Sequence, residues 1–74
     1  MKEQDMLVER IKNLCREKQM TYSALACASA VPVATIMHIL DKSTVNPGVL
    51  TIERLCEGFG ITLKEFFDSR EFNS

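Results

Sequence analysis

Apolar residues recur along this chain every three or four positions, which is the period of an amphipathic helix with one buried face. Leu7, Ile11 and Leu14 show this spacing first, and they predict a helix that Asp5 caps and that continues to about Lys18. Segments with the same period predict further helices at about 22–29, 32–41, 49–57 and 62–68. The pattern therefore predicts an all-α protein, a compact bundle of five helices.

Capping and helix-breaking residues support these boundaries. We expect the Thr21 hydroxyl to accept from backbone N–H groups one turn further on, as an N-cap does. Pro32 suits the first turn of the next helix, where its missing N–H is not needed. Either Gly58 or Gly60 is expected to end the fourth helix. Residues 62–65, with the sequence TLKE, form a capping box that opens the fifth.

The apolar faces of the five segments define one core. The side chains expected in it are Leu7, Ile11, Leu14, Leu25, Ala26, Ile36, Ile39, Leu40, Ile52, Leu55, Cys56, Leu63, Phe66 and Phe67. A chain of 74 residues has room for a single core of this kind. We therefore expect one domain over 1–74, with its core at about 5–68 and a polar tail at 69–74.

Several classes of function find no support in the composition. The three cysteines are odd in number, widely spaced and without a CxxC pair, which argues against a disulfide framework and a metal site. His38 is the only histidine, and no nucleophile–base set or glycine-rich phosphate loop is present, so we expect no enzyme, cofactor or small-molecule ligand. No apolar run is long enough for a membrane span, and no signal peptide opens the chain. These features predict a cytoplasmic protein.

Residues 21–47 carry the most informative motif: two short helices joined by a tight turn, followed by a polar loop. The second helix buries one stripe and leaves its other face free, which is the plan of a helix-turn-helix that enters a DNA major groove. This stretch resembles the Cro/repressor-type (XRE) helix-turn-helix family, and residues 50–68 resemble the two helices that close its domain. The matching motif residues are Leu25, Ala26, Val31, Thr35, Ile36, Asn46 and Pro47. The resemblance covers about 7–68 and implies the lambda-repressor-like five-helix fold.

The sequence departs from the family pattern at two places. Ala30 occupies the turn position that is usually glycine, and a positive φ there would cost about 1 kcal/mol. Cys15 and Leu40 occupy the positions where many relatives have a buried Arg–Glu pair. Replacing both members of a buried ion pair by apolar residues can be neutral or stabilising, whereas replacing one strands a charge. The paired change is compatible with the same fold.

The resemblance implies that the outward face of the third helix reads bases in double-stranded DNA. The positions concerned hold Val33, Ala34, Met37 and His38. Relatives often have Gln, Ser or Arg there, which hydrogen-bond base edges. Here Val33 and Ala34 suit thymine methyl groups, and His38 can donate to a purine N7 or to a phosphate. The alternative is that this apolar face binds a protein, as in an anti-repressor or an assembly domain.

Polar and basic residues around this helix are expected to contact phosphates. They are Thr21, Tyr22, Ser23, Thr35, Arg16, Lys18, Lys42, Ser43, Thr44 and Asn46. Charge is distributed in the matching sense, because residues 16–50 carry a net charge of +1 and residues 51–74 a net charge of −2. The positive charge is small, so we expect one subunit to bind DNA weakly and a homodimer to be needed.

Two surfaces are candidates for pairing. Phe67 and Phe72 are large apolar residues in the region that the family often uses for dimers, although both can instead cover the core. Cys27 and Ala28 are expected on the outer side of the second helix, as a second patch. Cys27 is also the only thiol expected to be reachable, which a thiol-based redox sensor would require. The main prediction is a homodimeric DNA-binding transcriptional regulator, most simply a repressor.

Overall fold

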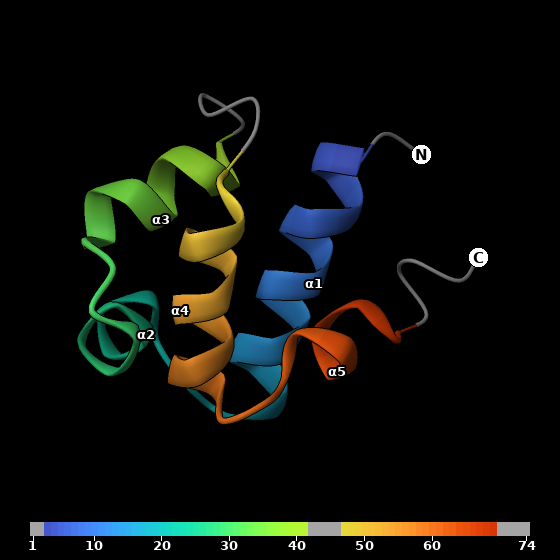
Figure 1. Ribbon diagram of the computed structural model, residues 1–74. Coiled ribbons are helices and arrows are strands. Elements are labelled where there is room, and N and C mark those ends of the chain that lie inside the picture. The colour runs from blue at the N-terminus through green and yellow to red at the C-terminus, as the bar shows by residue number, and fades with distance from the viewer. Residues whose placement is uncertain (1–2, 42–46, 70–74) are drawn as a thin grey trace.

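The computed structural model describes residues 3–41 and 47–69 of the chain. Its five helices are α1 (Glu3–Glu17), α2 (Tyr22–Ser29), α3 (Val33–Leu40), α4 (Val49–Phe59) and α5 (Leu63–Phe67). Figure 1 shows α4 running through the middle of the molecule, with α2 and α3 on one side and α1 and α5 on the other. The described residues contain no strand, so the predicted all-α bundle is confirmed.

The predicted start of the first helix is wrong, and of the two glycines expected to end the fourth helix it is Gly60 that ends it. α1 begins at Glu3, so Asp5 lies inside its first turn and is not the N-cap. An acidic residue is favoured both at the N-cap and in the first turn, because both positions place negative charge at the positive end of the helix. The sequence alone therefore does not distinguish the two positions. α4 continues to Phe59, and Gly60 ends it with a φ of 75°. Gly58 lies within the helix.

The other two predicted N-caps, Thr21 and Thr62, are confirmed. The Thr21 hydroxyl accepts from the backbone N–H of Ala24 at 3.0 Å. At α5 the Thr62 hydroxyl accepts from the Glu65 N–H at 3.0 Å, and the Glu65 carboxylate accepts from the Thr62 N–H at 3.1 Å. This reciprocal pair satisfies two N–H groups that have no partner within the helix. It explains how a helix of only five residues begins at a defined position.

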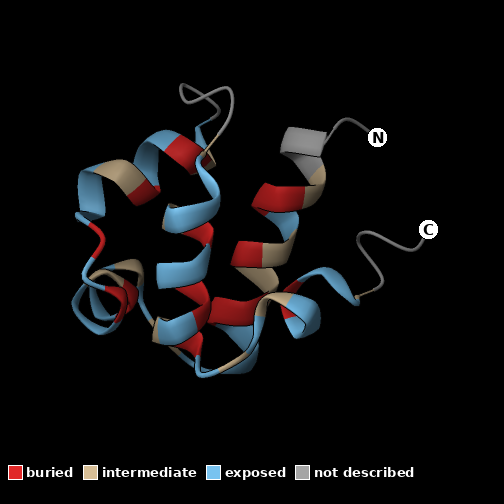
Figure 2. Ribbon diagram, in the orientation of Figure 1, coloured by how far each residue is buried: buried red, intermediate tan, exposed pale blue. Residues whose placement is uncertain are grey.

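Buried residues, which are red in Figure 2, occur on all five helices and form one hydrophobic core. The core consists of Leu7, Ile11, Leu14, Cys15, Leu25, Val31, Ile36, Ile39, Ile52, Leu55, Cys56, Phe59 and Phe66, with Ala26, Leu40 and Leu63 packed against it. Phe67 is the exception among the predicted core residues, because its side chain is 43% exposed. It meets the Phe66 ring edge to face at 5.0 Å between centroids, and Phe66 alone occupies the core position.

The turn between α2 and α3 contains one residue, Ala30, in a strained backbone conformation. Ala30 has a φ of 59° and a ψ of 25°, in the left-handed region that normally favours glycine. Ser29, which is buried, stabilises the turn with its hydroxyl. That hydroxyl donates to the Leu25 carbonyl at 2.6 Å and accepts from the Val31 N–H at 3.3 Å.

Arg10 connects α1 to the far end of the sequence. Its Nε donates to the Phe66 carbonyl at 2.7 Å, and its Nη2 donates to the Glu65 carbonyl at 2.9 Å. The guanidinium carbon also lies 5.8 Å from the centre of the Phe66 ring. The last carbonyls of a helix lack partners within it, so this arginine caps the C-terminal end of α5 from another helix. The sequence gives no local signal for this contact.

The cysteines divide as predicted. Cys15 and Cys56 are buried, and Cys27 is exposed on α2. Burial raises the pKa of the Cys15 thiol. Burial also raises the pKa of Cys56, although the positive charge of Arg10 partly opposes this and the negative charge of Glu53 adds to it. The two buried thiols are protonated, apolar core groups. Cys15 and Leu40 both belong to the apolar interior, as expected for the two residues that replace the buried ion pair.

Candidate nucleic-acid interface

The outward face of α3 carries the four residues predicted to contact bases. Val33 is 44% exposed and Met37 is 37% exposed, and Ala34 and His38 are exposed as well. The opposite side of the helix buries Ile36 and Ile39. The helix period alone produces this division, because positions 33, 34, 37 and 38 fall on one face. Thr35, a predicted phosphate contact, lies between the two faces and is half-buried.

The turn fixes where α3 begins and therefore which face is outward. Pro32 is the N-cap, with a φ of −56°. Its carbonyl accepts from the N–H groups of Thr35 at 3.0 Å and Ile36 at 3.2 Å, which closes the first turn of the helix. No acidic residue lies in the first turn of α2 or of α3. The positive ends of both helix dipoles are thus left without a nearby carboxylate in their own first turns.

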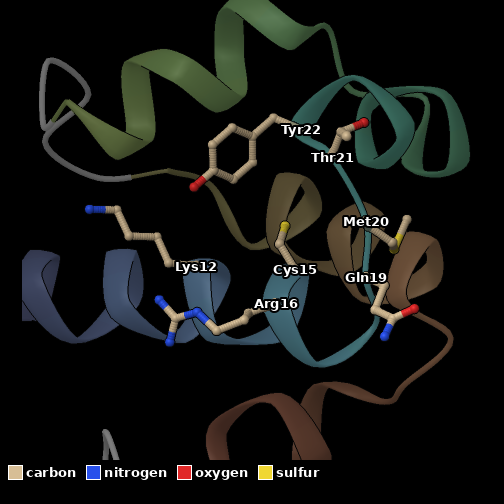
Figure 3. Close-up of a pocket in the computed structure, with 7 residues that line it drawn as sticks. All are labelled: Lys12, Cys15, Arg16, Gln19, Met20, Thr21 and Tyr22. Carbon is tan, nitrogen blue, oxygen red and sulfur yellow. The ribbon is translucent and has the colours of Figure 1, made fainter.

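A shallow pocket of about 570 Å³ lies between α1 and the start of α2, and Figure 3 shows its lining. Lys12 and Arg16 are one helical turn apart and share a face of α1. The Tyr22 hydroxyl points from α2 toward the Lys12 side chain (Figure 3). Arg16 Nη1 donates to the side-chain oxygen of Asn13 at 3.1 Å, which leaves its other N–H groups available. Two cations and a hydroxyl therefore meet at one edge of the molecule.

Lys12 is the member of this group that the sequence analysis missed. Its spacing from Arg16 was a usable signal, because residues four apart on a helix face the same way. The sequence does not show where Tyr22 lies relative to Lys12. The chain turns between α1 and α2 at Gln19, which has a φ of 54°, and Tyr22 at the start of α2 then lies over this part of α1. A basic residue in the middle of α1 becomes a candidate contact only when that packing is known.

The predicted phosphate contacts differ in exposure, and some of them lie outside the described residues. Tyr22 is half-buried, while Arg16, Lys18, Thr21 and Ser23 are exposed. Thr21 uses a lone pair of its hydroxyl for the helix cap and keeps the O–H as a donor. Lys18 follows the end of α1 and does not line the pocket that Arg16 lines. Lys42, Ser43, Thr44 and Asn46 lie outside the described residues, as does the dimer candidate Phe72.

Charge is absent from the middle of this surface. From position 19 to position 40 the sequence has no Asp, Glu, Lys or Arg, so neither α2 nor α3 contributes a charged side chain of these types. A second depression, of about 460 Å³, adjoins the start of α3 and is mostly apolar. Its lining residues are Ser23, Ala26, Cys27, Ala30, Val31, Pro32 and Val33. α2 and α3 thus present an uncharged, largely apolar surface, and the cations Lys12 and Arg16 lie on α1.

Comparison with known proteins identifies the family to which this domain belongs. Residues 10–69 match the sequence model of the Cro/C1-type HTH DNA-binding domain. The chain belongs to that family. The match covers all of α2 to α5 and most of α1, so the predicted family and five-helix fold are confirmed. No curated protein and no solved structure matched the chain.

Family membership makes α2 and α3 the helix-turn-helix of a DNA-binding domain. The residue roles within it remain predictions, because the family match covers the domain as a whole. Within residues 3–41 and 47–69, no three metal-ligating side chains come together. No helix in the described part of the chain combines the length and apolarity needed to cross a membrane.

Proposed function

We propose that this protein is a transcriptional regulator that binds operator DNA as a homodimer and represses the genes beside its site. α3 enters the major groove, where Val33, Ala34, Met37 and His38 face the base edges. The observation that supports this most is the arrangement around α3. Its outward face is exposed and carries no acidic side chain, and the pocket between α1 and the start of α2 adds the cations Lys12 and Arg16, which can bind a phosphate backbone.

The charged phosphate contacts in this proposal come from outside the two motif helices. Lys12, Arg16 and the Tyr22 hydroxyl bind the backbone on one side of the groove. Lys42, Ser43, Thr44 and Asn46, which lie outside the described residues, are further candidate phosphate contacts in the proposal. Each subunit offers few cations, and binding by counterion release scales with the number of phosphates neutralised. Two subunits double that number, which is why the proposal includes a homodimer, with Phe67 as its candidate contact on α5.

Selection of bound sites from random duplex DNA at low salt tests this function. A dimeric regulator enriches a palindromic sequence whose half-sites lie about 10 base pairs, or a multiple of that, apart. The affinity for the enriched site then falls steeply as salt is raised. A folded sample that enriches no sequence at low salt would contradict the proposal.

A protein-binding module on the same fold is the second candidate, and the exposed apolar side chains of Val33 and Met37 favour it. In that case α3 packs against a partner protein, as an anti-repressor or assembly domain does. Salt distinguishes the two, because an apolar protein interface changes little in affinity between low and physiological salt, while DNA binding weakens by orders of magnitude.

A further inference from the structure

α3 has none of the side chains that commonly read bases through paired hydrogen bonds. Its sequence, VATIMHIL, lacks Arg, Lys, Asn, Gln, Asp and Glu. Val33, Ala34 and Met37 are exposed alkyl groups on its outward face. In the major groove thymine alone among the four bases presents a methyl group, at C5, and that is the feature an alkyl side chain can contact.

The surface around α3 extends this apolar character toward α2. The depression beside Val33 is walled by Ala26, Cys27, Ala30 and Pro32, which add apolar area next to the first turn of α3. The cations Lys12 and Arg16 lie on α1 (Figure 3), and α3 itself carries no Lys or Arg. The apolar outward face of α3 complements a groove floor lined by methyl groups.

We infer that this domain recognises its site mainly through C5-methyl groups of pyrimidines, so that its half-site places thymines opposite Val33, Ala34 and Met37. The inference rests on the proposed function, because α3 must enter the major groove. It has a consequence for modified DNA. 5-Methylcytosine carries the same methyl group at the same ring position, so it replaces thymine at these positions although its hydrogen-bonding groups differ.

His38 fits this mode of recognition. A histidine N–H can donate to a purine N7, and both adenine and guanine present that acceptor in the major groove. The purine paired with thymine and the purine paired with 5-methylcytosine therefore satisfy His38 equally. Neither the alkyl groups nor this histidine separates T·A from 5-methyl-C·G, whereas unmodified C·G lacks the methyl group.

The test replaces single bases in the duplex enriched by selection. Thymines in the half-site are changed one at a time to uracil, which removes only the methyl group. We expect roughly fourfold weaker binding per methyl lost at an α3-facing position, the effect of one buried methylene-sized group. A change from thymine to cytosine also weakens binding, and 5-methylcytosine at the same position restores most of the loss.

A variant protein shows whether α3 is responsible, because removing a thymine methyl also alters the shape of the duplex. In Val33→Ala/Met37→Ala the ratio of affinities for thymine and uracil duplexes falls toward one. The matched control is Val49→Ala/Leu50→Ala, which shortens two side chains on α4 that are 67% and 59% exposed. The control keeps the wild-type ratio. Thermal unfolding of both variants checks that they fold.

The outcomes separate the inference from the function on which it rests. Tight, salt-dependent binding with equal affinity for thymine and uracil duplexes would overturn methyl recognition and leave the regulator standing. A methyl effect that Val33→Ala/Met37→Ala retains in full would also overturn it, since the duplex and not α3 would then be the cause. Absence of binding to any duplex by the folded protein would overturn both.

Discussion

At the scale of single residues, the two kinds of contact in the proposed interface come from different helices. Lys12 lies on α1 at the edge of the pocket beneath Tyr22, where a cation meets a phosphate of any sequence. His38 is exposed on α3, and in the proposed complex it donates an N–H to a base edge. Contacts with DNA phosphates determine the affinity and its salt dependence, and contacts with bases determine the preference among DNA sequences.

Substitution of these two residues separates affinity from preference. Lys12→Gln is expected to weaken binding to selected and random duplexes by the same factor and to lower the salt slope by about 0.9 per subunit. His38→Ala is expected to reduce the ratio of selected to random affinity by about 1 kcal/mol or more, with the salt slope unchanged. Titrations at several salt concentrations measure both quantities, with Lys64→Gln on α5 as the control. Equal effects of both variants on every sequence would exclude base contact by His38.

At the scale of the elements, the orientation of the helix-turn-helix depends on how closely α2 approaches α4. A Cβ atom added at Gly58 would lie 2.8 Å from the Cβ of Ser29, which is closer than side-chain atoms normally come. Ser29 in turn bonds the carbonyl of Leu25 and the N–H of Val31 with its hydroxyl. Glycine in the last turn of α4 thus lets the buried end of α2 pack against it, which fixes the turn that leads into α3.

Gly58→Ala therefore tests this packing. Alanine favours a helix more than glycine does, but the added methyl meets the backbone and Cβ of Ser29, so we expect a loss of about 1–3 kcal/mol in the free energy of unfolding. Gly48→Ala is the control, because its Cβ would meet nothing within 4 Å. Urea denaturation measures both. A Gly58→Ala protein as stable as the wild type would show that the two helices separate easily.

At the scale of the whole molecule, α1 and α5 hold the two ends of the domain together. Arg10 on α1 bonds the last carbonyls of α5, and the Phe66 ring lies under its guanidinium. This places Phe67 on the outside, beside a fixed helix end. A large aromatic side chain held in this way is suited to an interface with a second subunit.

Phe67→Ser is expected to weaken self-association at least tenfold, because it removes a half-exposed aromatic ring from the proposed dimer contact. Sedimentation equilibrium measures the change. Leu50→Ser on α4, where a residue of greater exposure loses its apolar side chain, is expected to leave the dimer intact. A dimer that survives Phe67→Ser with unchanged affinity would place the interface elsewhere.

The buried thiols predict how the stability of the whole domain responds to alkaline pH. Burial raises the pKa of Cys15 and Cys56 above 9.0, the value of a free thiol. Above about pH 9 the unfolded chain loses these protons while the folded chain keeps them, so the free energy of unfolding decreases with rising pH. Below that pH the contribution is fully present.

Urea denaturation between neutral pH and about pH 10 measures this slope. A Cys15→Ala/Cys56→Ala variant is less stable at every pH because it loses core volume, but its stability should decrease less steeply above pH 9. The two proteins share all other ionisable groups, so the difference between the two slopes isolates the two buried thiols. Parallel slopes would show that the thiols ionise in the folded protein as easily as in the unfolded one.

Local information in the sequence determined the helices, most of the core and the exposed face of α3. These depend on contacts within one helical turn, such as the Thr62–Glu65 capping box, or on the helix period. The tertiary structure decided what depends on residues distant in sequence. Only the packing of helices places Gly58 against Ser29, Arg10 at the end of α5, Phe67 outside the core and Tyr22 above Lys12. Local periodicity says which side of a helix is apolar, but not which neighbour covers it.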